Sequence, residues 1–350
     1  MLNIAYVGFG KSTNRYHLPY LKLRQDKFHV SRVVTPTLGK RPTEQSELEV
    51  TSTVFSTDID DIIEDETIDL VVVVTPSASH YQVTKQLLLA GKNVMVDKPM
   101  AASDIEARDL VNIAYDKKLF LMPFQSRRFD SDFLTVQRVI QNGYLGRLVD
   151  LEVHMDHYRP NDGQSNGNEI DGSLFGHGVH LVDQIVSLFG APNSAAYDIR
   201  STRLLNSPVD DQIEVNLFYP QAFKATIQTT ELATIQYPKW QLRGTQGTFI
   251  KYEVDEQEND LKTGVMPGDA RFGVDTPQNY GHLVYYNQSG DRIDKYIPSI
   301  QGDYGRVYDS VYNTLVKGMP KLVSDENMIT VMKILSAGLK EKGPHVVKFS

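Results

Sequence analysis

Short apolar segments alternate with amphipathic segments along the first third of the chain. Apolar runs of strand length cover residues 2–7, 28–34, 70–74, 93–96 and 119–124. Helical spacing predicts helices between them, at residues 16–24, 58–64, 77–89 and 103–117. The last of these helices opens at Ser103, with Glu106 in the capping-box position. Strands separated by helices pair in parallel, so this part of the chain predicts a doubly wound, mononucleotide-binding sheet.

The pattern changes after residue 124. Strands now follow one another without intervening helices, at residues 147–157, 195–204, 212–218, 224–230, 236–243 and 247–252, with a terminal strand at 345–349. Helices are expected at residues 130–141, from about 173, at 304–317 and at 325–338, and a polar loop at 160–168. We therefore expect an α/β chain of two domains. Residues 1–124 form a nucleotide-binding domain, and residues 125–350 form an α+β substrate and oligomerisation domain with a large, mainly antiparallel open sheet.

Composition narrows the functional classes. The 350 residues include 41% hydrophobic residues, no apolar run of membrane-spanning length and no cysteine, so disulfides and thiolate chemistry are excluded. The formal net charge of −8 disfavours nucleic-acid binding, which rests on neutralising phosphates. The chain enters an apolar strand directly, so we expect a cytoplasmic protein without a membrane partner.

A glycine-rich turn lies where a Rossmann unit binds pyrophosphate, between the first strand and the first helix. It reads Gly8-Phe9-Gly10-Lys11-Ser12-Thr13. Glycines permit the tight turn and a close backbone approach, and the helix amino terminus adds N–H groups. Thr13 occupies the third glycine position, which weakens the match, and an ordinary strand-to-helix turn is the alternative interpretation.

The end of the second strand bears on the choice of cofactor. Enzymes that use NAD usually place an acid there for the ribose hydroxyls. This chain instead has Thr35-Pro36-Thr37, followed by Lys40 and Arg41. The missing acid and the nearby cations favour a 2′-phosphate, so we expect NADP, with NAD as the alternative. Solvated loop charges would explain the two cations equally well.

Lys98 is the first candidate for proton chemistry. It follows the short strand at 93–96, in the sequence Asp97-Lys98-Pro99, and Thr75-Pro76 closes the apolar strand before it. Ligands of open parallel sheets bind beyond the carboxyl ends of the strands, so an amine held there can exchange protons with a substrate.

A second candidate group opens a helix of the second domain. Residues 176–183 read Gly-His-Gly-Val-His-Leu-Val-Asp. His180 and Asp183 are three residues apart on one helix face, so Asp183 can orient the His180 ring. Structural hydrogen bonding is the alternative. Metal ligation by His177, His180 and Asp183, with His154 and His157 in reach, is a third interpretation; the spacing disfavours it, and we expect no metal.

These motifs together resemble the glucose-fructose oxidoreductase, inositol dehydrogenase and MocA-like family, over essentially the whole chain. The resemblance implies that Lys98 is the catalytic or substrate-orienting amine, that His180 is the catalytic histidine, and that the protein forms a homodimer or homotetramer. Polyol dehydrogenases of the family usually carry an Asp four residues before that histidine. This chain has Gly176 there, which leaves His177 or residues 156–159 as replacements.

The function expected from the motifs and the resemblance is NAD(P)-dependent hydride transfer to or from a carbon of a sugar, inositol or related polyol. Two alternatives stay open: a non-catalytic dinucleotide-sensing regulator, and a reductase of a conjugated or imine substrate, as in biliverdin-reductase relatives. The residues expected to contact the cofactor are Gly8, Phe9, Gly10, Lys11, Ser12, Thr13, Thr35, Thr75, Pro76, His80, Asp97, Lys98 and Gln125. Those expected near the substrate are Arg127, Tyr158, Arg159, His177 and Asp183. Trp240 is expected to pack in the core.

Overall fold

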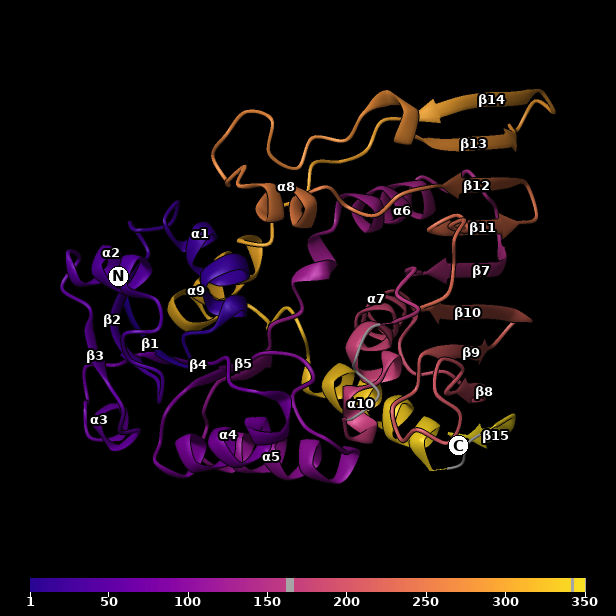
Figure 1. Cartoon of the computed structure of the whole chain (residues 1–350). Coiled ribbons are helices and arrows are strands. Elements are labelled where there is room, and N and C mark those ends of the chain that lie inside the picture. Colours follow the sequence, from indigo (N-terminus) through magenta and orange to yellow (C-terminus); the bar gives the residue numbers. More distant parts are fainter. Residues whose placement is uncertain (162–166, 341–342, 350) are drawn as a thin grey trace. The chain divides into compact units, whose positions relative to one another are not determined.

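The computed structural model describes residues 1–161, 167–340 and 343–349 (Figure 1). The chain groups into two compact units. The first comprises Met1–Ser126, Met266–Asp269 and Tyr304–Ile329, and the second comprises Arg127–Val265, Ala270–Asp303 and Thr330–Ser350. Part of the polar loop expected at residues 160–168 lies outside the described residues. Among the described residues, no helix is long and apolar enough to cross a membrane.

A six-stranded parallel sheet forms the centre of the first unit, in the order β3-β2-β1-β4-β5-β6. Its strands are β1 (Leu2–Val7), β2 (Phe28–Val34), β3 (Val54–Ser56), β4 (Leu70–Val73), β5 (Val94–Val96) and β6 (Leu121–Pro123). Every residue of β4 is buried, because the strand is apolar throughout and central in the sheet. The strand order reverses between β1 and β4, which makes their carboxyl ends the switch point where such sheets bind ligands. The predicted doubly wound sheet is confirmed.

Helices connect the strands of this sheet. They are α1 (Leu18–Leu21), α2 (Pro42–Glu49), α3 (Asp60–Ile63), α4 (His80–Leu89) and α5 (Asp104–Asp116). The late helix α9 (Arg306–Lys317) also belongs to this unit. A π-helical turn, η1 (Thr13–His17), precedes α1, so the helical segment expected at 16–24 begins at Thr13 and ends at Leu21. Figure 1 shows α4 and α5 side by side. The Ser103 hydroxyl accepts a hydrogen bond from the Glu106 amide at 3.2 Å, which confirms the predicted cap of α5.

The helix α9 belongs to the first unit, although the sequence pattern assigns it to the second domain. Its Tyr308 hydroxyl lies 2.6 Å from the Tyr6 hydroxyl of β1 and 2.7 Å from Nδ1 of His17. The His17 ring stacks on Phe124 with ring centroids 3.9 Å apart. All these side chains are buried, so aromatic packing and hydrogen bonds fix the late helix against the first sheet.

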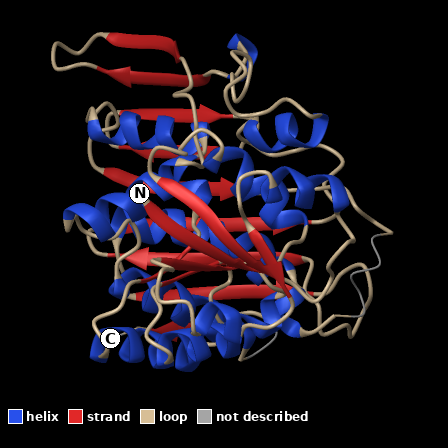
Figure 2. Cartoon of the chain, turned by 90° about the vertical axis from the view of Figure 1, so that its left-hand side faces the viewer, coloured by secondary structure: helices blue, strands red, loops and turns tan. Residues whose placement is uncertain are grey.

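The second unit contains a nine-stranded sheet in the order β14-β13-β12-β11-β7-β10-β9-β8-β15, seen as a stack of strands in Figures 1 and 2. Its strands are β7 (Leu148–His154), β8 (Ser194–Arg200), β9 (Gln212–Tyr219), β10 (Phe223–Thr230), β11 (Trp240–Gly244), β12 (Gly247–Lys251), β13 (Gly281–Tyr286), β14 (Arg292–Ile297) and β15 (His345–Lys348). Only β7 and β10 pair in parallel, so the predicted mainly antiparallel sheet is confirmed.

Helices α6 (Ser131–Gln141), α7 (Val179–Phe189) and α10 (Asp325–Leu339) lie on one side of this sheet, and α8 (Gln257–Thr263) lies in the connection after β12 (Figure 1). The Trp240 side chain is fully buried and stacks on Phe133 of α6, which confirms its expected place in the core. The alternating pattern did not reveal α2, β3, α8 or the hairpin β13–β14. The expected strand at 195–204 ends at Arg200, and the expected strand at 236–243 begins at Trp240.

Candidate functional site

The glycine turn comes directly after β1, and its first residue, Gly8, leaves no room for a side chain. Gly8 has a φ of +111°, and a Cβ there would collide with the carbonyl oxygen of Val74, after β4. A Cβ on Gly10 would meet no atom within 4 Å. The Thr13 hydroxyl donates to the Gly8 carbonyl at 2.9 Å, so the residue that replaces the third glycine closes the turn from inside. The open space at Gly10 and the tight contact at Gly8 fit a turn that lets a phosphate approach the backbone.

A hydrogen-bonded carboxylate links this turn to Lys98. The Ser12 hydroxyl donates to Oδ2 of Asp97 at 2.7 Å, and the Lys98 amide donates to Oδ1 at 2.8 Å. The turn follows β1 and Asp97 follows β5, with β4 between them, so the contact spans the switch point of the sheet. The half-buried Lys98 precedes a cis peptide bond to Pro99. The structure therefore brings Lys98 to the carboxyl edge of the sheet, beside the glycine turn.

His80 holds two loops of this edge together. Its Nε2 lies 2.8 Å from the Thr75 carbonyl oxygen and its Nδ1 lies 2.7 Å from the Pro99 carbonyl oxygen. The ring is buried, so both nitrogens are committed to backbone oxygens. This arrangement explains how His80 can affect the cofactor site: it fixes the loop after β4 and the lysine motif relative to each other.

Two further cofactor candidates lie at strand ends. Gln125, after β6, is buried, and among the described residues its Oε1 has no hydrogen-bond partner. A buried amide oxygen without a partner suits an external donor such as a carboxamide. Thr35, at the end of β2, is buried, and its hydroxyl lies 3.0 Å from that of Thr37. Arg41 lies 3.0 Å from Glu44, so one of the two loop cations is already in a local ion pair.

Candidate functional side chains of the second unit lie just after the ends of β7 and β10. These strands pair in parallel in an unbroken register. The first pair is Asp150 opposite Lys224, and the last is His154 opposite Gln228. Continuing this register past both strands places His157 beside Glu231. Backbone hydrogen bonds confirm the alignment, because the His157 amide donates to the Thr230 carbonyl at 2.8 Å. Glu231 was not among the residues expected from the sequence, since the parallel pairing of two distant strands was not predicted.

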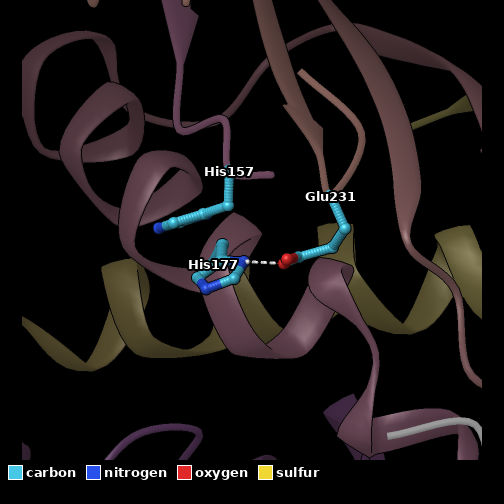
Figure 3. A group of neighbouring side chains, drawn as sticks. All are labelled: His157, His177 and Glu231. Atoms are coloured by element: carbon cyan, nitrogen blue, oxygen red, sulfur yellow. Dashed lines mark ion pairs between the residues drawn. The ribbon is translucent and has the colours of Figure 1, made fainter. Parts of the chain in front are cut away.

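His157, His177 and Glu231 form one cluster, which we call the HHE cluster (Figure 3). The two imidazole rings stack with centroids 4.7 Å apart, and Nδ1 of His177 lies 3.4 Å from Oε1 of Glu231. Arg159 Nη1 lies 3.6 Å from the other carboxylate oxygen. Burial, followed by the nearby charge of Arg159, lowers the pKa of His157 to about 4, so this imidazole is neutral at pH 7. His177 and Arg159 were both expected near the substrate, and the structure brings them together around Glu231.

Asp183 pairs with a buried arginine in the structure. Both of its carboxylate oxygens accept hydrogen bonds from Arg128, each at 2.7 Å, and both side chains are buried. The carboxylate therefore neutralises a buried guanidinium. His180, on the first turn of α7, is itself buried.

Two other substrate candidates also have local explanations. Arg127 forms ion pairs with Asp130 and with Glu258. Tyr158 is 58% exposed, and its backbone forms an isolated bridge to Leu232 beyond the strand ends. At Gly176 a Cβ would meet no atom within 4 Å, so packing does not require glycine at this position.

The parallel sheet with its switch point, the glycine turn and the linked lysine define a dinucleotide-binding oxidoreductase. Residues 2–124 match the oxidoreductase family's NAD-binding Rossmann fold, and residues 137–345 match its C-terminal alpha/beta domain. The chain belongs to the Gfo/Idh/MocA oxidoreductase family, and the resemblance noted from the motifs is confirmed.

Full-length relatives support this assignment. The chain is 42% identical over 347 residues to YhhX, an uncharacterized oxidoreductase of Escherichia coli (strain K12), with 99% of both chains covered. It is 30% identical to IolW of Bacillus subtilis (strain 168), a scyllo-inositol 2-dehydrogenase (NADP(+)), with 97% of this chain and 93% of that protein covered. The crystal structure of an oxidoreductase from Bacillus cereus is 40% identical, with a TM-score of 0.96 over 100% of this chain and 99% of that one.

Proposed function

We propose that this protein is an NADP-dependent dehydrogenase or reductase that transfers hydride between nicotinamide and a carbinol or hemiacetal carbon of a sugar, inositol or related polyol. The observation that carries the proposal is the hydrogen bond from Ser12 to Asp97, which connects the glycine turn to the lysine motif at the switch point. Lys98, in that lysine motif, is the candidate for proton chemistry beside a cofactor held by the turn. IolW, a full-length relative, is named as an inositol dehydrogenase that uses NADP.

The residues of the first unit would bind and orient the cofactor. The amide groups after Gly8 would bind the pyrophosphate, and Gln125 would accept a hydrogen bond from the carboxamide at its buried amide oxygen. Absence of an acid after β2, together with Lys40 and Arg41, supports NADP over NAD, although Arg41 must then exchange its contact with Glu44 for the 2′-phosphate. When bound, the nicotinamide supplies or accepts the hydride.

Lys98 and His180 would handle the proton of the substrate hydroxyl. In oxidation, His180 accepts this proton as general base, while the Lys98 ammonium lowers the energy of the developing alkoxide and positions the oxygen. In reduction, the same pair returns a proton.

The open side of the nine-stranded sheet supports self-association as a homodimer or homotetramer. Along β9, residues Ile213, Val215 and Leu217 are buried, while the alternating Gln212, Glu214 and Asn216 are only half-buried and Phe218 is exposed. A sheet with helices on one side leaves such a face for a second copy. Light scattering of the purified chain tests this: a monomer at micromolar concentration would exclude it.

A cofactor titration followed by a substrate screen tests the proposed function. Fluorescence titration should show tighter binding of NADPH than of NADH, and turnover should appear with a member of a panel of inositols, aldoses and polyols. Dinucleotide binding without turnover on any of them would favour a sensor. Turnover only with conjugated or imine substrates would favour the reductase alternative.

A further inference from the structure

The HHE cluster combines side chains that the hydride-transfer chemistry does not use. One candidate ligand atom from each of His157, His177 and Glu231 lies within 4.8 Å of the others. Glu231 is buried and the two imidazoles are half-buried. Two imidazoles and one carboxylate are the ligand set of three-coordinate protein sites for zinc, which leave a fourth position open.

The distances within the cluster fit an ion better than a hydrogen bond. A charge-assisted N–H···O bond is about 2.7–2.9 Å long. His177 Nδ1 and Glu231 Oε1 are 3.4 Å apart. Two ligands at 2.0–2.1 Å from a tetrahedral ion are separated by about 3.4 Å, which matches this spacing.

His157 supplies a third donor. Its Nδ1 is buried and has no hydrogen-bond partner among the described residues. The candidate atoms of the three side chains all lie within 4.8 Å of one another, and a rotation of the His157 ring would bring its nitrogen to the ligand spacing of a tetrahedral ion. The backbone of His157 needs no change, since its amide is already fixed on the Thr230 carbonyl.

We propose that His157, His177 and Glu231 form a binding site for a divalent transition metal of the zinc class. Imidazole ligands select zinc, cobalt or nickel over magnesium and calcium, which prefer oxygen ligands. The open fourth position would take water or an oxygen of a ligand. The site does not include Lys98 or His180, so it stands independently of the proposed hydride transfer.

Calorimetric titration of the chelator-treated full chain with zinc chloride tests the site in the absence of cofactor and substrate. We expect one equivalent per chain with micromolar or tighter affinity, and no binding of magnesium under the same conditions. His157→Gln and Glu231→Gln should each weaken zinc binding by at least about 10-fold, since loss of even an outer-shell partner costs 10–100-fold. Far-UV circular dichroism and Trp240 fluorescence check that the variants are folded.

The matched control is His282→Gln. His282 lies 2.7 Å from Asp294 on the hairpin β13–β14 and offers an exposed histidine–carboxylate pair outside the cluster. This variant should bind zinc as the wild type does. X-ray absorption of the wild-type chain with one equivalent of zinc should show two imidazole ligands, and this readout decides the case if the cluster variants do not fold. Absence of stoichiometric binding, or equal binding by the cluster variants, would overturn the proposal.

Discussion

Replacing Arg128 with methionine tests whether Asp183 is a structural counter-ion. The two side chains form a bidentate pair with both contacts at 2.7 Å, and they are only 7% and 2% exposed. Removing one partner of a buried pair leaves an uncompensated charge and costs about 3–5 kcal/mol. We therefore expect Arg128→Met to lower the free energy of unfolding of the second unit by about that amount. The double variant Arg128→Met/Asp183→Leu should recover much of the loss, because neither charge remains buried.

Urea unfolding followed by tryptophan fluorescence measures the free energy of unfolding of the second unit. Trp240 is the only tryptophan of the chain and is fully buried in the second unit. Arg243→Met is the control, because Arg243 pairs with Asp150 while 68% of its side chain is exposed. Such surface pairs contribute about 0–1 kcal/mol. A loss below about 1 kcal/mol for Arg128→Met, or simple additivity in the double variant, would refute the reasoning.

The remaining predictions concern the first unit. Gly8→Ala should destabilise this unit by roughly 1–3 kcal/mol in thermal unfolding, because of backbone strain and the collision with Val74. Gly10→Ala should fold normally but weaken NADPH binding in a fluorescence titration. Equal stability of the two variants would contradict this expectation. Burial lowers the pKa of His17 from 6.5 to about 4, so the unfolded chain binds its proton first as the pH falls. The contribution of neutral His17 to the free energy of unfolding is thus fully present above about pH 6.5 and falls by about 3 kcal/mol in total as the pH drops towards 4. Urea unfolding followed by circular dichroism should show a smaller pH dependence for His17→Gln than for the wild type. Arg41→Ala should weaken NADPH binding by about 10-fold, the order expected for one lost charge-assisted bond, and leave NADH unchanged; equal losses for both would remove Arg41 from cofactor selection.

The parallel sheet could be predicted because its signals are local. Five of its six strands, all except β3, are short apolar runs closed by turn residues. Ser103 and Glu106, three residues apart, likewise mark the start of a helix. The polar helices α2 and α8 escaped prediction because they lack an apolar stripe. The hairpin β13–β14 escaped for a related reason: its strands lie at the edge of the sheet, where no residue of β14 is fully buried.

The site residues that depend on long-range pairing could not be predicted. Glu231 reaches His157 only through the parallel pairing of β7 and β10, which are separated by two other strands in sequence. Asp183 looked like a partner for His180 because helical spacing is visible in the sequence, while Arg128, its actual partner, is 55 residues away. Tyr308 shows the same limit, since nothing local indicates that α9 packs on β1. The motifs that form the glycine turn and the lysine edge are contiguous, and these could be recognised directly.

Single-turnover kinetics of Lys98→Met with NADPH and the substrate found in the screen test the central claim most directly. Loss of the group that stabilises the alkoxide and positions its oxygen should reduce the rate of hydride transfer by about 100-fold or more. NADPH affinity, measured in the same samples, should change little, because the Ser12–Asp97 contact and the Gly8 turn do not involve the Lys98 side chain. An unchanged hydride-transfer rate with normal NADPH binding would contradict the role assigned to Lys98.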